Sequence, residues 1–344
     1  MKRVEDREER LFISALMMPP AERDRFLALA CNSEPLLHAH VIRLVESAES
    51  SASMFDESQM PARREGLERQ IGPYSVIHEI GEGGCGVVYL AEQMLPVRRQ
   101  VALKVIKLGM DTNDVIGRFS AERQALALMD HPGIAKVLDA GATPAGRPYF
   151  AMELVRGIKI TDFCAQVRAS VRDRIALFIQ VCQALEHAHQ KSIVHRDIKP
   201  SNVLVTLCDG TAIAKIIDFG IAKAMQGRLT EHTLHTALGQ IVGTPEYISP
   251  EQTIPGSGHV DLRSDIYSLG VLLYELLTGN TPFGIASASR RAIDAVGSSL
   301  HAAEPLSPST YLRELLRPRS RNPAFPRDDI AVQWMRQVRG DLDW

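Results

Sequence analysis

Cysteine is scarce in this chain, and its pattern excludes a disulfide framework. The five cysteines are Cys31, Cys85, Cys164, Cys182 and Cys208. Their number is odd and no pair forms a Cys-x-x-Cys motif, so neither a disulfide-stabilised scaffold nor a paired-thiol metal or redox site is indicated. We therefore expect reduced thiols in a cytoplasm-like compartment.

Long hydrophobic runs and an excess of one charge are also missing. No apolar run approaches the roughly 20 residues of a membrane helix. The short apolar run at residues 11–18 has acids as well as bases before it and no small-residue cleavage site after it, so we expect no signal peptide. The net charge of -2 gives no argument for a nucleic-acid or membrane partner. We expect a cytoplasmic protein, with membrane attachment through a region beyond this sequence left open.

The first 70 residues have the spacing of amphipathic helices. Apolar residues recur every three or four positions in Glu8–Met18, Pro20–Cys31 and Pro35–Glu49, and the polar stretch Ser50–Gln70 looks like a linker. No cluster of convergent polar residues occurs here. We interpret residues 1–70 as a small helical bundle or docking element without a catalytic role.

The hydrophobic period then changes from helix-like to strand-like. Alternation predicts strands at 74–80, 87–91, 100–108, 136–140 and 148–153, and a helix at 112–130. From residue 171 helices dominate, at 173–190 and 265–278. The second of these is apolar on nearly every side, which predicts a buried central helix that ends at a Gly279 cap. Residues 284–329 are rich in Ser, Pro and Arg and are expected to form a loop with one or two helical pieces.

A glycine-rich turn joins the first two predicted strands. Residues 81–86 (Gly-Glu-Gly-Gly-Cys-Gly) match G-x-G-x-x-G, which alone is a weak signal because dinucleotide-binding folds share it. In those folds the glycines open a helix, whereas here they connect strands and Lys104 follows on the next strand. This context favours a phosphate-binding hairpin over a Rossmann-type dehydrogenase or a plain tight turn.

Glu122 is the expected partner of Lys104. Phe119, Glu122, Leu126 and Met129 share one face of the predicted helix, so the carboxylate lies on its apolar side. A buried charge needs an opposite charge, and Lys104 can supply it. The alternative is a glutamate at a solvent-exposed helix edge.

A polar loop, His195–Asn202, carries the densest group of candidate catalytic side chains. Asp197 could accept or orient a hydroxyl proton, and Lys199 could neutralise a transferring phosphoryl group. Asn202, together with Asp218 at the end of an apolar strand, offers the oxygen ligands that Mg²⁺ prefers.

In this order, these motifs resemble those of bacterial eukaryotic-like (Hanks-type) serine/threonine protein kinases. The resemblance runs from about Ile71 to Thr281 and includes Ser249-Pro250-Glu251 and Asp265. It implies an α+β, two-lobed protein kinase fold. The N-lobe would occupy residues 71–154 and the C-lobe residues 155–344, behind the helical segment 1–70.

The resemblance also implies an activity and its cofactors. The expected reaction is transfer of the ATP γ-phosphoryl group to Ser or Thr hydroxyls of protein substrates, with Mg²⁺, or Mn²⁺ in its place. Catalytic roles are implied for Asp197, Lys199, Lys104 and Glu122, and metal binding for Asn202 and Asp218. The positions that match ATP-binding residues are Gly81, Glu82, Gly83, Gly84, Cys85, Gly86, Val88, Ala102, Lys104, Met152 at the back of the adenine pocket, and Glu153 and Val155 in the hinge.

Further positions follow from the same resemblance. Asp265 would hold backbone amides of the catalytic loop, and His195 would pack structurally. Arg196 before Asp197 resembles kinases that are activated by phosphorylation, which we expect by autophosphorylation, with a kinase dimer as one route. The candidate phosphosites are Thr230, Thr233 and Thr236, and Thr244 lies in the substrate loop. His187 and His189 are interpreted as helix-end residues without a metal role.

The sequence departs from the family pattern at its C-terminal end. Residues 340–344 resemble the start of a late C-lobe helix, so the C-lobe is interpreted as truncated, without its last helices. The arginine that pairs with the Glu251 position is missing, with Arg336 and Arg339 as candidate substitutes. The alternative function is therefore a nucleotide-binding pseudokinase or signalling scaffold. At the glycine-loop tip, Cys85 is interpreted as a tolerated small side chain in preference to a redox-sensitive thiol.

Overall fold

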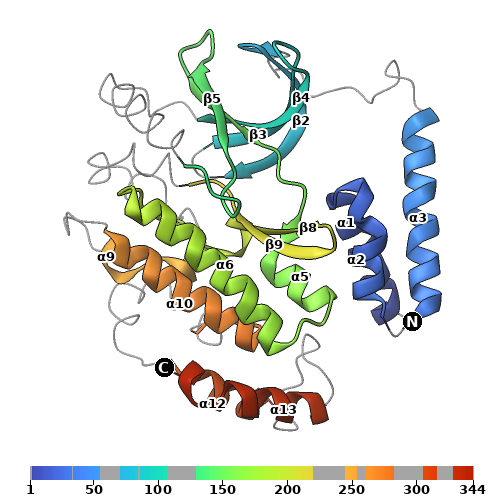
Figure 1. Cartoon of the computed structure of the whole chain (residues 1–344), viewed down its shortest axis with the longest axis vertical. Helices are drawn as coiled ribbons and strands as arrows, with labels where there is room; N and C mark the ends of the chain where they lie inside the picture. The colour runs from blue at the N-terminus through green and yellow to red at the C-terminus, as the bar shows by residue number, and fades with distance from the viewer. Residues whose placement is uncertain are drawn as a thin grey trace. The chain divides into compact units, whose positions relative to one another are not determined.

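The structure is a computed structural model, and it describes residues 2–32, 34–54, 70–83, 86–106, 129–219, 245–253, 261–282, 305–315 and 328–343. The chain divides into two compact units (Figure 1). The first combines residues 1–158 with residues 204–215, and the second combines residues 159–203 with residues 216–344. Strands dominate one part of the first unit, and helices dominate the second unit.

The first unit contains a six-stranded sheet. Its strands are β1 (Gln70–Ile71), β2 (Tyr74–Gly83), β3 (Gly86–Gln93), β4 (Arg99–Ile106), β5 (Val137–Ala142) and β6 (Pro148–Glu153), in the spatial order β1-β2-β3-β4-β6-β5. All neighbouring strands pair antiparallel. The five strands predicted from hydrophobic alternation are thereby confirmed, each to within a few residues of its expected ends.

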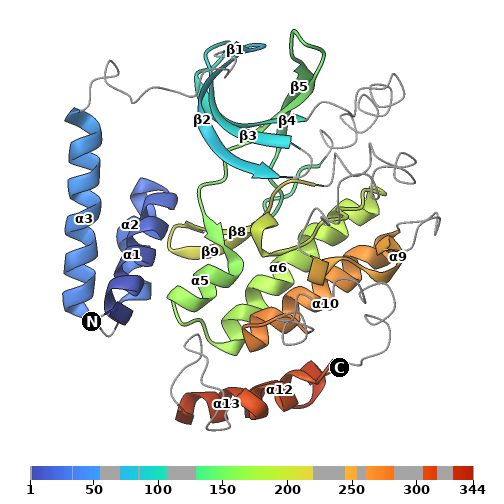
Figure 2. The same ribbon diagram turned by 180° about the vertical axis from the view of Figure 1, so that it is seen from behind.

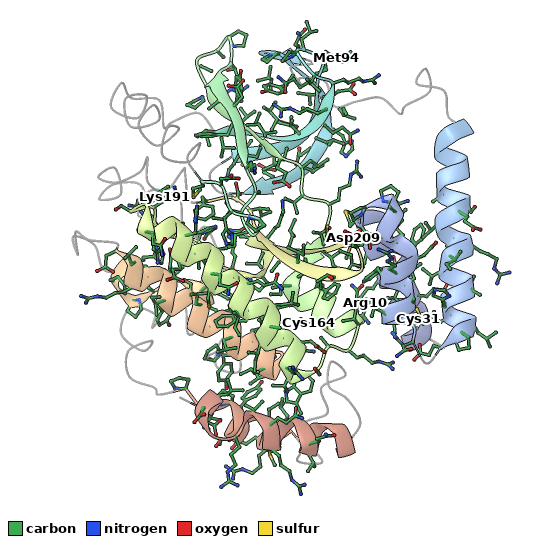
Figure 3. The ribbon with its side chains drawn as sticks, in the orientation of Figure 1. Arg10, Cys31, Met94, Cys164, Lys191 and Asp209 are labelled. Atoms are coloured by element: carbon green, nitrogen blue, oxygen red, sulfur yellow. The ribbon has the colours of Figure 1, made fainter. Side chains whose placement is uncertain are left out.

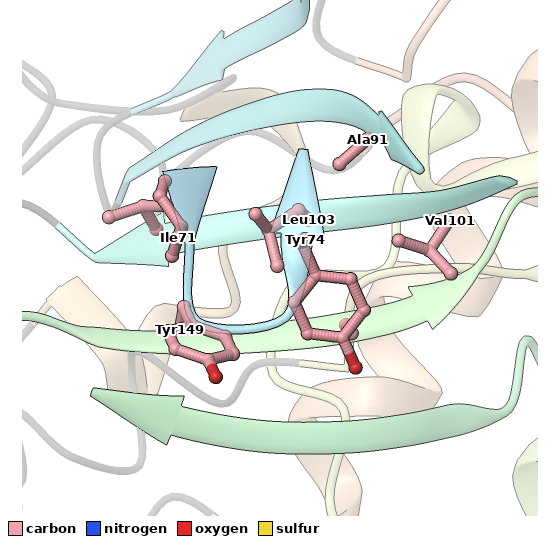
Figure 4. Packing of buried hydrophobic residues seen from close by; sticks show 8 residues of the cluster. Ile71, Tyr74, Ala91, Val101, Leu103 and Tyr149 are labelled. Atoms are coloured by element: carbon pink, nitrogen blue, oxygen red, sulfur yellow. The ribbon is translucent and has the colours of Figure 1, made fainter. Parts of the chain in front are cut away.

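One face of this sheet is closed by a hydrophobic cluster (Figure 4). Side chains alternate between the faces of a strand, so Val101, Leu103 and Val105 of β4 point to the same side. The ring of Tyr74 meets that of Tyr149 edge-on, with centroids 5.9 Å apart, and the Tyr74 hydroxyl donates to Asp139 Oδ2 at 3.0 Å. The cluster consists of Ile71, Tyr74, Ala91, Val101, Leu103, Val105, Tyr149 and Ala151.

The N-terminal helices also belong to the first unit and lie side by side (Figures 1 and 2). They are α1 (Lys2–Met17), the 3₁₀ turn η1 (Pro20–Glu22), α2 (Arg23–Ala30) and α3 (Pro35–Met54). Their apolar positions form a small core that includes Leu11, Phe26 and Val41. The helical prediction is confirmed. The linker was expected to begin at Ser50, but α3 continues to Met54. Residues 50–54 are therefore helical despite their polar composition.

A second, three-stranded sheet has the order β7-β8-β9. Its strands are β7 (Ile158–Lys159), β8 (Val203–Cys208) and β9 (Thr211–Ile216). A two-residue turn of Asp209 and Gly210 joins β8 to β9. Both residues have positive φ, 50° and 76°, as the tight hairpin turns that suit strand twist require.

The second unit is built mainly from α5 (Ile160–Gln166), α6 (Val171–Gln190), α10 (Leu262–Thr278), α12 (Pro308–Leu315) and α13 (Asp328–Val338). Short elements are η3 (Pro200–Asn202), η4 (Pro245–Tyr247), α9 (Pro250–Thr253) and η6 (Asp341–Asp343). Ser170 and Asp173 form a capping box that starts α6. Gly279, at φ 75°, ends α10 as predicted, and its N–H donates to Glu275 O at 2.7 Å.

The central helix α10 is mostly buried, as expected, with one exception. Leu272, Leu276 and Leu277 are almost fully buried. Ile266 is 59% exposed, so the expectation of burial on nearly every side is wrong for the first turn of the helix. Ser264 and Asp265 of the same turn are almost fully buried, so only the face that carries Ile266 is open to solvent.

The C-terminal helices pack on α6 and α10. Trp334 and Val338 of α13 join Val171, Leu277 and Leu312 in one hydrophobic cluster. The indole Nε1 of Trp334 donates to Leu277 O at 3.0 Å, and the guanidinium of Arg174 lies 4.6 Å from the Trp334 ring centroid. Residues 328–338 thus contribute to the core of the second unit.

Two further findings bear on the sequence-based expectations. In the stretches that the structure describes, no helix combines the length and apolar character that crossing a membrane requires. The expected helix at 112–130 lies outside the described residues except for Met129 and Asp130, which are not helical, and most of 284–329 lies outside them as well.

Candidate active site

The candidate nucleotide-binding residues of β3, β4 and β6 share the sheet face opposite the hydrophobic cluster. Val88 is the partner of Lys104 across β3 and β4, and Ala102 is the partner of Met152 across β4 and β6. Residues directly opposite each other in an antiparallel pair project to the same side. Lys104 and Met152 are 8% and 7% exposed, so a buried cation lies within an otherwise apolar surface. The structure therefore brings four of the predicted ATP-binding residues together.

The glycine-rich segment forms the end of a β-hairpin. Gly81, Glu82 and Gly83 are the last residues of β2 and pair with Val88, Val87 and Gly86 of β3. The glycines therefore do not open a helix, and the Rossmann alternative is excluded. A Cβ on Gly86 would lie 2.4 Å from Val105 O, so only glycine fits there. Gly84 and Cys85, at the tip, lie outside the described residues.

The predicted hinge begins where β6 ends. The Glu153 carboxylate pairs with the Lys215 ammonium through Oε1 and accepts the Lys136 N–H at 3.3 Å through Oε2. The Glu153 N–H donates to Lys136 O at 2.8 Å. Val155 follows in an irregular, half-buried stretch. The Glu153 side chain is thus held by neighbouring basic residues.

The candidate catalytic side chains of the polar loop lie within hydrogen-bonding distance of one another. Lys199 Nζ is 2.7 Å from Asp197 Oδ2. Asn202 Nδ2 donates to the same oxygen at 3.0 Å and to the Asp197 backbone O at 2.8 Å. The loop therefore places a cation and an amide donor on a single carboxylate, which fixes its orientation.

Asp265, fully buried at the start of α10, holds the backbone of this loop. Its carboxylate accepts the N–H groups of His195 at 2.8 Å and Arg196 at 2.7 Å, as the family resemblance implied. Burial by itself would raise the pKa of Asp265. Hydrogen bonds from His189 and from the two loop amides outweigh that effect and hold the pKa below its usual range, so the carboxylate is charged.

His195 is fully buried and packs structurally, as expected. Its Nδ1 accepts the Asp197 N–H at 3.2 Å, and its Nε2 donates to Ile217 O at 3.2 Å. The ring centroid lies 4.7 Å from that of Phe219. Burial lowers the pKa of His195, in agreement with a neutral imidazole that donates from one nitrogen and accepts at the other.

Asn202 and Asp218 are brought together by backbone pairing. The Ile217 N–H donates to Asn202 O at 2.9 Å, which places Asp218 one residue beyond this bond. Asn202 Nδ2 donates to Asp197, and its Oδ1 accepts a long bond from Ser201 Oγ at 3.4 Å, so Oδ1 keeps acceptor capacity for a ligand. A carboxylate and a carboxamide oxygen are hard donors that fit Mg²⁺ or Mn²⁺, with phosphates and water completing the shell. Elsewhere in the described part of the chain, no group of three or more His, Cys, Asp or Glu could hold a metal ion.

Two site residues have an unusual backbone conformation. Arg196 and Asp218 have φ of 66° and 64°, in the left-handed region that L residues rarely adopt. Such strain persists where surrounding contacts fix the backbone. For Arg196 the contacts are its N–H bond to Asp265 and the Gln252 Nε2 bond to its carbonyl at 3.2 Å.

Sequence reasoning missed two of these supporting residues. His189 is more than a helix-end residue, because its Nε2 lies 2.8 Å from Asp265 Oδ2. Gln252 follows the Ser-Pro-Glu motif and links Arg196 O to Ser249, whose N–H and Oγ both donate to Gln252 Oε1 at 3.1 Å. No periodicity or motif marks either contact, since both join residues far apart in sequence.

Ser264 is one partner of Glu251. The Glu251 Oε1 accepts a hydrogen bond from Ser264 Oγ at 2.6 Å. Arg336 and Arg339 are both exposed. Although burial would raise the pKa of Glu251, the bonds from Ser264 and neighbouring groups outweigh it and lower the pKa.

Several predicted site residues cannot be placed. Glu122, the expected partner of Lys104, lies outside the described residues. The same holds for the phosphosite candidates Thr230, Thr233 and Thr236 and for Thr244. Their roles stay predictions.

Comparison with known proteins gives a consistent result. The family described as "Protein kinase domain" matches residues 74–317. The chain is 36% identical to the serine/threonine-protein kinase PrkC of Bacillus subtilis over 244 residues, which is 70% of this chain and 36% of PrkC. It is 40% identical to the serine/threonine-protein kinase PknB of Mycobacterium tuberculosis over 216 residues, 61% of this chain and 33% of PknB. These matches cover about a third of the length of the curated relatives.

A solved structure is also similar. The crystal structure of the Mycobacterium tuberculosis PknI kinase domain aligns with a TM-score of 0.52 and 26% identity. The alignment covers 80% of this chain and 99% of that one. The fold prediction, an α+β protein kinase fold, is confirmed.

Proposed function

The chain belongs to the protein kinase domain family, in its bacterial Hanks-type serine/threonine branch, and from this premise we propose that it transfers the ATP γ-phosphoryl group to Ser or Thr hydroxyls of protein substrates. The observation that carries the proposal is the Asp197 carboxylate, held by Lys199 and Asn202 on a loop anchored to Asp265. We divide the chain into the helical segment 1–70, an N-lobe at 71–154 and a C-lobe at 155–344.

Asp197 receives or orients the proton of the substrate hydroxyl. Its carboxylate is fixed before substrate arrives, because Lys199 and Asn202 both bind Oδ2. The substrate hydroxyl binds at this oriented carboxylate. Lys199 places a positive charge beside the position where charge develops on the transferring phosphoryl group, and such preorganised charge is a large term in catalysis.

ATP binds on the sheet face that carries Val88, Ala102, Lys104 and Met152, under the glycine-rich hairpin. The apolar side chains suit an adenine ring, and Lys104 suits phosphate oxygens. We propose an ion pair of Lys104 with Glu122, and backbone contacts from Glu153 to Val155 with the nucleotide. Asn202 and Asp218 hold Mg²⁺, or Mn²⁺ in its place. The bound ion neutralises phosphate charge.

Activation follows from phosphorylation of the segment after Asp218. Thr230, Thr233 and Thr236 are the proposed sites, Arg196 is the proposed partner of the added phosphate, and a transient dimer is the proposed route. Thr244 belongs to the substrate loop. The described cysteines Cys31, Cys164, Cys182 and Cys208 are free, which supports a cytoplasmic, reducing location.

The test is incubation of the purified chain with labelled ATP, Mg²⁺ and a generic protein substrate. Asp197→Asn keeps the size of the side chain and removes its charge, so labelling should fall at least a hundredfold. Glu186→Gln, on the exposed side of α6, is the matched control and should label normally. Equal labelling by the wild type and Asp197→Asn would contradict the kinase proposal. Nucleotide-dependent melting without labelling would point to a scaffold.

A further inference from the structure

We propose that Glu22, in the N-terminal helical segment, is a positioning residue for the metal-binding candidates Asn202 and Asp218. Glu22 acts through the β8–β9 hairpin, whose closed end it binds. The inference rests on the function proposed above and extends it to residues that precede the kinase match at 74–317. It gives the N-terminal segment a role in the same reaction.

The hairpin connects the two metal-binding candidates. Asn202 immediately precedes β8, and Asp218 follows β9 after one intervening residue. The Ile217 N–H bond to Asn202 O, at 2.9 Å, continues the pairing beyond the ends of the strands. Asn202 and Asp218 therefore stand at the open end of the hairpin, and the spacing of their oxygens depends on how its strands lie.

The closed end is bound by Glu22. In a two-residue turn the hydrogen bond runs between the flanking residues, so the Gly210 N–H is not used within the turn. It donates to Glu22 Oε2 at 3.2 Å, across 188 positions of sequence. Figure 3 shows the neighbouring turn residue, Asp209, beside α1 and α2.

The Glu22 carboxylate is fixed in place. Glu22 is only 8% exposed, and a buried charge needs charged or hydrogen-bonding partners. Arg25 Nη1 lies 3.0 Å from its Oε1 and 3.3 Å from its Oε2. Arg25 also covers the turn, because its Cδ lies 3.6 Å from the position that a Cβ on Gly210 would take. Glu22 and Arg25 of the helical segment thus both contact the turn at Gly210.

Two other contacts of the hairpin do not involve the N-terminal helices. Gly157 approaches β8 so closely that a Cβ on it would lie 2.6 Å from Val205 O. On β9, Lys215 pairs with Glu153. Removing the Glu22 carboxylate leaves these contacts and frees the turn. Each six-residue strand spans about 20 Å. When the turn is no longer held by Glu22, the paired strands can twist more freely, and this twist reaches residues 202 and 218 at their other end.

The experiment compares metal binding and amide exchange in the full chain. Glu22→Ala removes the acceptor, Glu22→Gln keeps an oxygen acceptor for the Gly210 N–H, and Asp24→Ala removes a nearby exposed acid as the matched control. Free Mn²⁺ is followed by electron paramagnetic resonance at saturating ADP. Hydrogen exchange of residues 203–217 is measured without metal.

We expect Glu22→Ala to weaken Mn²⁺ binding about threefold to tenfold, since the loss of groups that orient metal ligands costs about tenfold or more when they touch the ligands directly. Exchange at Gly210 and along β8 and β9 should accelerate in the same variant. Glu22→Gln and Asp24→Ala should stay within about twofold of wild type. Wild-type Mn²⁺ affinity in Glu22→Ala, or equal weakening in Asp24→Ala, overturns the proposal.

A simple stabilising role for Glu22 predicts a different pattern, in which thermal stability falls and Mn²⁺ affinity does not. If Glu22→Ala lacks a cooperative unfolding transition, Arg25→Ala takes its place, because it releases the carboxylate that Arg25 holds. Arg25→Ala should weaken Mn²⁺ binding and accelerate hydrogen exchange by smaller factors than Glu22→Ala. Wild-type Mn²⁺ affinity together with wild-type exchange in Arg25→Ala overturns the proposal. A wild-type chain that binds Mn²⁺ but transfers no phosphoryl group contradicts the proposed function, while binding and exchange still test Glu22.

Discussion

His189 Nε2 lies 2.8 Å from Asp265 Oδ2, and through that carboxylate it is linked to the backbone of the catalytic loop. The same Oδ2 accepts the His195 N–H, and Oδ1 accepts the Arg196 N–H. A helix end, the first turn of the central helix and the polar loop therefore meet at one buried charge. The position of Asp197, the residue after Arg196, depends on this junction.

Replacing His189 should weaken catalysis without touching a substrate-binding group. His189→Ala leaves the Asp265 carboxylate with one fewer donor in a buried site, which costs about 1–3 kcal/mol. We expect a lower melting temperature and about tenfold lower kcat, with KM for ATP unchanged. His187→Ala, on the same helical turn but not bonded to Asp265 Oδ2, is the control. A normal kcat in His189→Ala would show that the two loop amides suffice to orient Asp265.

Lys199 should affect kcat more than KM for ATP. Its Nζ lies 2.7 Å from Asp197 Oδ2, so Lys199→Ala removes both the group that orients the carboxylate and the charge beside the transferring phosphoryl group. We expect kcat to fall about 10²- to 10³-fold, the usual range for one preorganised charged donor. Steady-state kinetics at varied ATP measure both constants, with Lys191→Ala, an exposed residue after α6, as control. A change confined to KM would assign Lys199 to ATP binding.

Glu275 should make unfolding pH-dependent around neutrality. Burial, then the charges of Glu246 and Asp162, raise its pKa to about 7. Because the folded state holds this proton more tightly than the unfolded state, stability falls as pH rises from about 4.5 to about 7, and the cost is complete above that window. At 1.36 kcal/mol per pKa unit, and after allowance for partial exposure, the cost is about 2 kcal/mol.

Glu275→Gln mimics the neutral acid and should remove that dependence. We expect the variant to be more stable than wild type at pH 8 and equally stable at about pH 4, as measured by denaturant unfolding. Glu186→Gln, an exposed acid on α6, should leave the wild-type pH dependence intact. Equal effects of Glu275→Gln at the two pH values would mean that the carboxylate is charged throughout.

Trp334 should be needed for the stability of the helical unit. Its indole N–H donates to Leu277 O, and its ring lies against the half-buried guanidinium of Arg174, which donates to Leu276 O at 2.8 Å. Trp334→Phe keeps the ring and loses the N–H, at a cost of about 1–2 kcal/mol. Trp334→Ala also leaves a cavity and should cost about 3–5 kcal/mol. Thermal unfolding measures both, with the exposed Arg336→Ala as control; equal stability of all three would place α13 outside the folded core.

The proposed phosphosites predict a large loss of activity when they are removed together. Thr230→Ala, Thr233→Ala and Thr236→Ala in one chain remove the groups whose phosphates would pair with Arg196. We expect at least tenfold lower substrate phosphorylation and no autophosphorylation of this segment, read by mass spectrometry. Full activity of the triple variant would mean that activation does not depend on these threonines.

Local patterns carried most of the fold and the core of the site. The strands of the sheet followed from alternation, and Asp197, Lys199 and Asn202 came from eight consecutive residues, so their proximity needed no long-range information. Contacts such as His189 with Asp265, Gln252 with Arg196 and Glu22 with Gly210 could not be predicted in this way. Each joins residues 56 or more positions apart, and neither helix nor strand periodicity marks such pairs.

The chain passes back and forth between its two units, and this affects when the first unit can finish folding during synthesis. The chain leaves the first unit after Ile158, returns to it at Leu204 and leaves again after Lys215. The helices of residues 2–54 emerge from the ribosome well before the turn that Glu22 binds, which is complete only with Gly210. At about 5–20 residues per second, the first unit waits several seconds for its last two strands. A fragment that ends near residue 158 therefore lacks residues 204–215, which belong to the first unit.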